Sequence, residues 1–174
     1  MTEPFLDIDG LKAMGPRVIL AVSSERQLAG LKRFFMGLPR TVVGIVDEDF
    51  PFLSNLNMIE NITLGDMYTN HRGLAAATAR ILPTIEALGM REAMGRRKET
   101  LTQEEMLKAH ILRCLAGDSR AVFMEYPRIW DLRLLLEYLK NISSDMALWI
   151  SCHEKSLRTY EGLGFETFYL PDDS

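Results

Sequence analysis

The sequence predicts an α/β domain built on a mostly parallel sheet. Four short runs are apolar at nearly every position, which is typical of strands buried on both faces. Segments with helical periodicity separate these runs, and strands that alternate with helices favour parallel strands joined by crossover helices. The four runs are residues 17–23, 41–46, 121–124 and 147–152.

The first third of the chain contains two of these strands and one helix. Residues 17–23 form the first predicted strand, and Ser24 after it is a residue type favoured at helix N-caps. Residues 25–38 repeat apolar side chains every three or four positions, which predicts an amphipathic helix. The second strand, residues 41–46, leads into an acidic turn at residues 47–49.

The middle of the chain is expected to be helical. We expect a short helix over residues 58–65 and another over residues 72–82, after which Pro83 starts or kinks the next turn and Gly89 ends the helical run. Residues 91–100 are polar and basic and are predicted to be a connection. A strong helix is predicted over residues 103–116 because apolar side chains mark one of its faces.

The last third alternates regularly. The strand at residues 121–124 precedes a Leu-rich helix at residues 129–141, and the strand at residues 147–152 follows. A short helix over residues 153–162 and a final strand over residues 167–170 complete the prediction.

Composition narrows the classes of function. The chain has 20 Lys and Arg against 24 Asp and Glu, so its net charge of −4 argues against a broad nucleic-acid surface. Cys114 and Cys152 lie in apolar contexts without metal-ligand spacing, which favours reduced thiols. The N-terminus lacks the pattern of a signal peptide, and no apolar run approaches the roughly 20 residues that span a bilayer. We therefore expect a cytoplasmic protein.

A phosphate-binding loop is missing where an α/β nucleotide-binding domain would carry one. Such a loop follows a strand and reads GxxxxGK[ST], with glycines that let successive N–H groups face phosphate and a Lys that neutralises it. Gly10 and Gly15 have the glycine spacing, but Pro16 and Arg17 follow and the pair precedes the strand. Residues 22–30 form a tight strand-to-helix turn without these residue types.

The stretch LTQEEMLKAHILRCLAGDSRAVFMEYP, residues 101–127, resembles a segment of ATP-binding-cassette (ABC) ATPases. In that family LSGGQ opens a helix that ends in ARALAGDP, and four apolar residues and DEP follow. Thr102 falls on the Ser of LSGGQ, and residues 103–105 (QEE) replace Gly-Gly-Gln. Glu125 falls on the magnesium-associated Asp, and Tyr126 falls on the catalytic Glu.

The flanking segments resemble the family in the same order. Residues 42–68 resemble its Q-loop region, with Glu48 in place of the Gln. Residues 150–154 (ISCHE) resemble its switch motif and place His153 on the switch histidine. The P-loop glycines, the Lys and the Ser-Thr pair fall on other residue types, namely Val22, Glu25, Gln27, Leu28, Ala29 and Gly30.

This resemblance runs from about residue 6 to residue 170 and implies a single reduced domain over residues 1–174. It implies a P-loop-NTPase-like sheet with a helical portion, about residues 51–116, inserted in the α/β core. The family's leading antiparallel strands have no counterpart in the sequence.

The departures from the family predict a degenerate ATPase that does not hydrolyse ATP. Without the Lys and the glycine N–H groups the β- and γ-phosphates lose their main partners, and a Tyr at position 126 does not act as a carboxylate base. Mg-ATP is the one cofactor that the resemblance implies, no catalytic residue is assigned, and Glu125 is the one candidate metal ligand. The vestigial nucleotide positions are Ser23, Ser24, Gly30, Glu48, Thr102, Glu125, Tyr126 and His153.

The resemblance also implies partners. Such domains dock on a membrane permease near the Q-loop, here residues 47–68, and pair with another cassette as a homodimer or with an active ATPase as a heterodimer. A structural or regulatory role beside a transporter follows. The expected apolar docking patch is drawn from Phe50, Phe52, Leu53, Met58 and Met67, about half of which are expected to pack in the core instead.

Two alternatives stay open at the level of sequence. YEGLGFE, residues 160–166, looks like the C-terminal YxxLGFE of acyl-CoA-dependent N-acetyltransferases, although it also fits a helix end, a glycine cap and a strand. That family needs [QR]xxGx[GA], whereas QLAGLK, residues 27–32, fails at its last position and lies too early. The other alternative is a structural interaction protein unrelated to transport.

Overall fold

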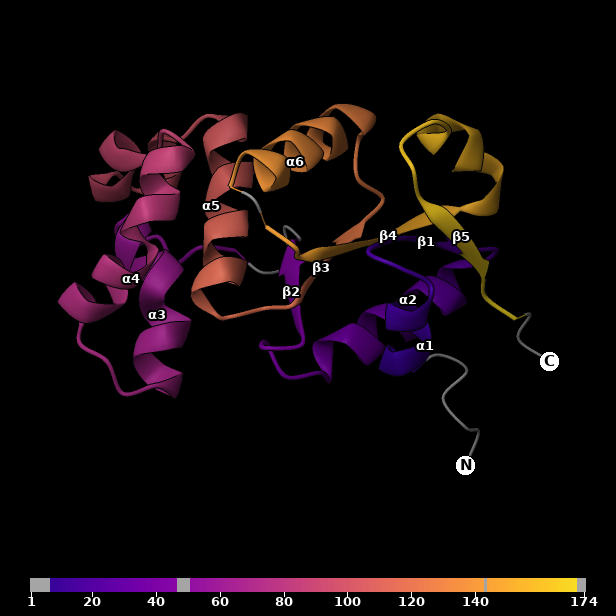
Figure 1. The fold of residues 1–174 in the computed structure, drawn as a ribbon, viewed down its shortest axis with the longest axis horizontal. Coiled ribbons are helices and arrows are strands. Elements are labelled where there is room, and N and C mark those ends of the chain that lie inside the picture. Colours follow the sequence, from indigo (N-terminus) through magenta and orange to yellow (C-terminus); the bar gives the residue numbers. More distant parts are fainter. Residues whose placement is uncertain (1–6, 47–50, 143, 172–174) are drawn as a thin grey trace.

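The computed structural model describes residues 7–46, 51–142 and 144–171. Within them, five strands form one sheet in the order β2-β3-β4-β1-β5, and every neighbouring pair is parallel (Figure 1). The predicted parallel sheet is therefore confirmed. The strands are β1 (Arg17–Val22), β2 (Val43–Val46), β3 (Ala121–Glu125), β4 (Ala147–His153) and β5 (Glu166–Tyr169).

Helices cover both faces of the sheet, which explains why the central strands are apolar throughout. Helices α1 (Ile8–Ala13) and α2 (Glu25–Met36) pack on one face, and α5 (Gln103–Ala116) and α6 (Ile129–Asn141) pack on the other (Figure 1). Successive strand residues point to opposite faces. Phe123 and Trp149 accordingly join the core under α1 and α2, where both rings pack against Phe35.

A helical group lies beyond β2, next to α5 (Figure 1). It consists of α3 (Met58–Thr69), α4 (Leu74–Ala87) and the short 3₁₀ helices η1 (Arg91–Gly95) and η2 (Lys98–Thr100). A capping box fixes the start of α3, because the Asn57 side chain accepts from the Glu60 N–H and the Glu60 carboxylate accepts from the Asn57 N–H.

Several predicted boundaries are wrong in informative ways. Helix α3 continues one turn beyond residue 65, and α4 begins two residues later than expected, at Leu74, and includes Pro83 before it ends at Ala87, near the predicted stop at Gly89. A proline has no N–H to donate, so it leaves the carbonyl four positions earlier without its helical partner. Here that carbonyl belongs to Ala79, an exposed residue. The basic connection at residues 91–100 contains η1 and η2, and Ala93 and Met94 in it are buried.

The C-terminal segment forms the 3₁₀ helix η3 (Glu154–Tyr160), a turn and β5. Gly162 and Gly164 both have positive φ, at 79° and 72°, which places the YEGLGFE glycines in a turn that favours this residue type. The segment thus serves as a helix end, a turn and a strand start. None of the helices in the described parts of the chain is long and apolar enough to cross a membrane.

Candidate nucleotide-binding edge

The carboxyl ends of the central strands bring most of the predicted site residues to one edge of the sheet. Ser23 and Ser24 follow β1, Glu125 ends β3 and Tyr126 follows it, and His153 ends β4. The strand register places Val22 opposite His153 and Glu125 opposite Ser151. In open α/β sheets this edge is where ligands bind. Glu48 lies outside the described residues.

The turn between β1 and α2 is closed by its own side chains. It contains only Ser23 and Ser24, and the Ser24 Oγ caps α2 by accepting from the Gln27 N–H at 3.2 Å. Gln27 is buried, with 3% of the residue exposed. Its Oε1 accepts from the Ser23 N–H at 2.7 Å and from the Ser23 Oγ at 3.1 Å. Its Nε2 donates to the Pro171 carbonyl at 3.0 Å. Two backbone N–H groups at the helix start, where a phosphate would seek donors, are therefore already bonded within the chain, namely those of Ser23 and Gln27.

A carboxylate also occupies the electropositive start of α2. Glu25 is the first residue of this helix, where a negative side chain is stabilised by the helix dipole. Burial, followed by the negative charges of Glu25 and Glu125, raises the pKa of the nearby Tyr126 phenol. A phosphate at this point would meet the Glu25 charge and no P-loop lysine.

Glu125, the candidate magnesium ligand, is paired within the protein. Its Oε2 lies 2.6 Å from the Lys32 Nζ of α2, and the two side chains are only 21% and 23% exposed. Among the described residues, no group of three or more His, Cys, Asp or Glu is arranged to hold a metal ion. A carboxylate held by an ammonium group at this distance is not set up as a ligand for a divalent cation, so the site does not fit Mg-ATP.

Tyr126 stands in a strained conformation at the end of β3. Its φ of 41° lies in the left-handed region, and its N–H donates to the Ser151 carbonyl at 3.1 Å. The half-buried ring packs against the cores on both faces of the sheet. With its pKa raised, the phenol stays neutral and does not supply the general base of a hydrolase.

His153 has a local structural role. It is the N-cap of η3, and its Nδ1 accepts from the Lys155 N–H at 3.4 Å. The neighbouring Cys152 is buried, and burial raises the pKa of its thiol to about 11, so it is not an activated nucleophile.

The residues that replace the signature glycines stabilise α5 and its neighbours. Thr102 and Glu105 form a capping box at the start of α5, and Glu105 also accepts from Arg96 at 2.9 and 3.1 Å. Glu104 accepts from the Tyr138 hydroxyl at 2.7 Å and pairs with Lys108 at 2.9 Å. These contacts lower the pKa of both carboxyls below the usual range.

Sequence reasoning missed two residues that shape this edge, Gln27 and Lys32. One signal for Gln27 was available, because a residue four positions after Ser23 lies one turn along the new helix and reaches back to the strand end. Gly30, one of the predicted positions, lies in α2 with no atom within 4 Å of where its Cβ would be, so it makes no close approach.

The structure divides the residues of the predicted docking patch between the core and the surface. Phe52 and Met58 belong to the core, because the Phe52 ring packs at a tilt against His110 and Met58 begins α3 against the buried cluster. Phe50 lies outside the described residues, Met67 is half-buried and Leu53 is exposed. The exposed apolar side chains of α3 are instead Leu64 and Tyr68, 42% and 85% exposed.

Comparison with known proteins identifies the fold. No protein-family model and no curated protein matches the sequence. The structure is similar to CbiO1 from Clostridium perfringens, part of the ABC transporter complex CbiONQ, with a TM-score of 0.67 and 12% identity over 89% of this chain and 73% of that one. It is also similar to the dimeric bacterial ABC transporter cassette MJ0796, with a TM-score of 0.54 and 16% identity over 84% of this chain and 63% of that one.

The chain therefore has the fold of ABC ATPases, as the resemblance of its motifs predicted. It spans 73% and 63% of these two cassettes. At such low identity the comparison concerns the fold, whereas function has to be argued from the site.

Proposed function

We propose that this chain is an ABC-type ATP-binding-domain homologue that does not hydrolyse ATP and that acts as a structural or regulatory subunit of a transport system. The observation that carries this proposal is the closed turn between β1 and α2. There the Gln27 Oε1 accepts from the Ser23 N–H, and the Ser24 Oγ accepts from the Gln27 N–H.

The chemistry of phosphoryl transfer explains why this observation supports the proposal. Catalysis depends almost entirely on positioning and on positive charge around the phosphates. At this edge the charge is negative at Glu25, the acid of β3 is paired with Lys32, and Tyr126 stands where a carboxylate would orient water. These three features support the proposed absence of hydrolysis.

Two exposed surfaces support partners of the kind that cassettes have. Leu64 and Tyr68 are four residues apart on α3 and so share a face, with Leu53 exposed before the helix. Trp130 is 68% exposed at the start of α6, just after the candidate edge. We assign the α3 surface to a membrane permease and the Trp130 surface to a second cassette, either another copy or an active ATPase. The protein would then work in the cytoplasm at the inner face of the membrane.

An ATPase assay on the purified full chain tests the first half of the proposal. Transporter ATPases turn over on the order of 1 s⁻¹, and we expect no phosphate release above background from this chain. Turnover near that rate would contradict the proposal if Glu125→Gln abolished it, because a contaminating ATPase would not respond to that variant.

Membrane association tests the second half. We expect the chain to sediment partly with membranes of its source cells and Leu64→Asp with Tyr68→Asp to release it. Trp130→Ala is the matched control, because it removes an exposed apolar side chain from the other surface and should leave sedimentation unchanged. Equal sedimentation of all three proteins would refute the assignment of α3.

A further inference from the structure

A cavity of about 380 Å³ lies at the opposite edge of the sheet from the candidate nucleotide position. It opens where the end of α2, the start of β2, the end of α3 and the turn after α5 meet. Volumes of roughly 300–1,000 Å³ are typical of small-molecule sites. We propose that this cavity binds a small amphipathic carboxylate, with its apolar body inside and its carboxylate on Arg40.

Apolar side chains form the inner walls. Phe35, Leu38, Ile45 and Ile62 line the cavity from α2, the following loop, β2 and α3. Gly44 forms part of the base, because a Cβ there would overlap the Cys114 side chain, and α5 therefore packs directly on the β2 backbone. A ligand that buries an apolar group here gains favourable binding free energy from the hydrophobic effect.

Arg40 supplies the positive charge. Its side chain is exposed and crosses α3 at Gly65, where the Nη1 lies 3.6 Å from the position of a Cβ. Its backbone carbonyl accepts from the Ser119 Oγ at 2.6 Å, which fixes the loop that carries it. Among the described residues its guanidinium has no ion pair, and a carboxylate is the group that an arginine fork matches best.

Arg113 adds to the positive potential of the same wall. It lines the cavity from α5 and contacts the Phe52 ring face at 4.5 Å and the His110 Nδ1 at 2.9 Å. Burial lowers the pKa of its guanidinium, and the nearby charge of Arg40 lowers it further.

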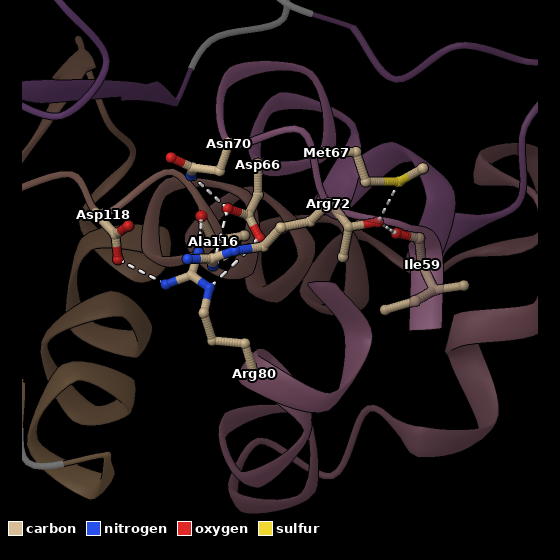
Figure 2. Close-up of polar contacts among 9 residues, drawn as sticks. Ile59, Asp66, Met67, Asn70, Arg72, Arg80, Ala116 and Asp118 are labelled. Atoms are coloured by element: carbon tan, nitrogen blue, oxygen red, sulfur yellow. Dashed lines mark hydrogen bonds and ion pairs between the residues drawn. The ribbon is translucent and has the colours of Figure 1, made fainter. Parts of the chain in front are cut away.

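The acids in the wall do not oppose an anion, because arginines already neutralise them. Asp66 is buried and contacts Arg72 at 3.3 Å and Arg80 at 3.4 Å. Arg80 also pairs with Asp118 at 2.6 Å, so that one guanidinium bridges the two carboxylates (Figure 2). These ion pairs satisfy the two carboxylates and their arginines within the protein. Arg40 is then the positively charged group that we assign to the ligand.

Glycine amides allow binding to be located. Gly44, Gly65 and Gly117 line the cavity, whereas Gly30 and Gly95 do not. We would titrate the full chain, labelled with ¹⁵N, with octanoate, 1-octanol and octylammonium. Octanoate is expected to shift the three cavity amides with a millimolar dissociation constant, and 1-octanol is expected to bind about tenfold more weakly because it lacks the charge.

Two variants and a matched control complete the test. Arg40→Gln should reduce octanoate affinity about tenfold and leave 1-octanol unaffected. Gly65→Leu should fill the cavity and abolish the shifts, whereas Gly30→Leu makes the same change on α2 in open space and should bind normally. If Gly65→Leu does not fold, Arg40→Gln decides the outcome.

Three results would overturn the proposal. One is the absence of octanoate shifts at concentrations well into the millimolar range. Another is equal affinity for octanoate, 1-octanol and octylammonium, which would mean that Arg40 does not favour a carboxylate over a neutral or a positively charged group. The third is a set of shifts that includes Gly30 and Gly95 as strongly as the cavity glycines.

Discussion

Acidification should destabilise the protein through His110, a buried histidine on α5. The residue is 9% exposed, and its ring lies 4.6 Å from the Phe52 ring, centroid to centroid. Its Nδ1 is 2.9 Å from the Arg113 Nη2, which only donates, so Nδ1 has to accept and the ring has to be neutral. Burial, with the charge of Arg113, lowers the pKa of His110 from 6.5 to about 3.

The magnitude follows from the difference between the folded and unfolded pKa. Because the folded pKa is the lower one, the unfolded state takes up a proton first, and stability is lost as the pH falls below 6.5 and towards 3. A pH of 5 is about 1.5 units below the pKa of the histidine in the unfolded chain. At about 1.36 kcal/mol per unit, the free energy of unfolding falls by about 2 kcal/mol. That is a large share of a typical stability of about 5–15 kcal/mol.

Urea unfolding at pH 7.5 and pH 5 measures this loss. His110→Gln should lose about 2 kcal/mol less than the wild type between the two conditions, because glutamine does not titrate and its amide oxygen still accepts from Arg113. His71→Gln, a change at an exposed histidine, should behave as the wild type. Identical losses in the wild type and His110→Gln, or an NMR titration of His110 with a midpoint near 6.5, would refute the reasoning.

Two further predictions concern stability. Asp66→Asn should cost about 3 kcal/mol in urea unfolding, because it leaves Arg72 and Arg80 without their buried carboxylate, whereas Asp118→Asn, at an exposed end of the same network, should cost clearly less. Equal losses would show that the buried carboxylate is not the centre of the network. Gly44→Ala should lower the melting temperature because its Cβ would overlap Cys114; Gly30→Ala, in open space on a helix, should raise it slightly. A neutral Gly44→Ala would mean that α5 does not pack on the β2 backbone as described.

The sequence was sufficient for the elements that carry strong local signals. The bounds of α5 and α6 were predicted to the residue, because Thr102 caps α5 and both helices carry a clear apolar face. The course of α4 was not predictable from Pro83 alone. A proline can stay inside a helix when the carbonyl that it frees finds another partner, such as water. For Pro83 of α4 that carbonyl belongs to Ala79, and its surroundings depend on how the helix packs.

The candidate site was predictable in residue type and not in contacts. The absence of a P-loop lysine and of its glycines is plain in the sequence. That Lys32 of α2 would pair with Glu125 of β3 depends on two segments far apart along the chain, and the same holds for the Gln27 bond to the Pro171 carbonyl. The Arg40 cavity combines four separate segments and had no local signal at all.

The closed turn between β1 and α2 is tested most directly by a thermal-shift titration of the purified chain with Mg-ATP, with acetyl-CoA alongside. A ligand at a hundredfold over its dissociation constant adds about 2.7 kcal/mol, which raises the melting temperature by roughly 5–11 °C for a chain of this length. With the Ser23 and Gln27 amides already bonded, we predict no shift with either ligand. A saturable rise with Mg-ATP that Ser24→Asp removes would contradict the claim, since it would place the nucleotide at that turn.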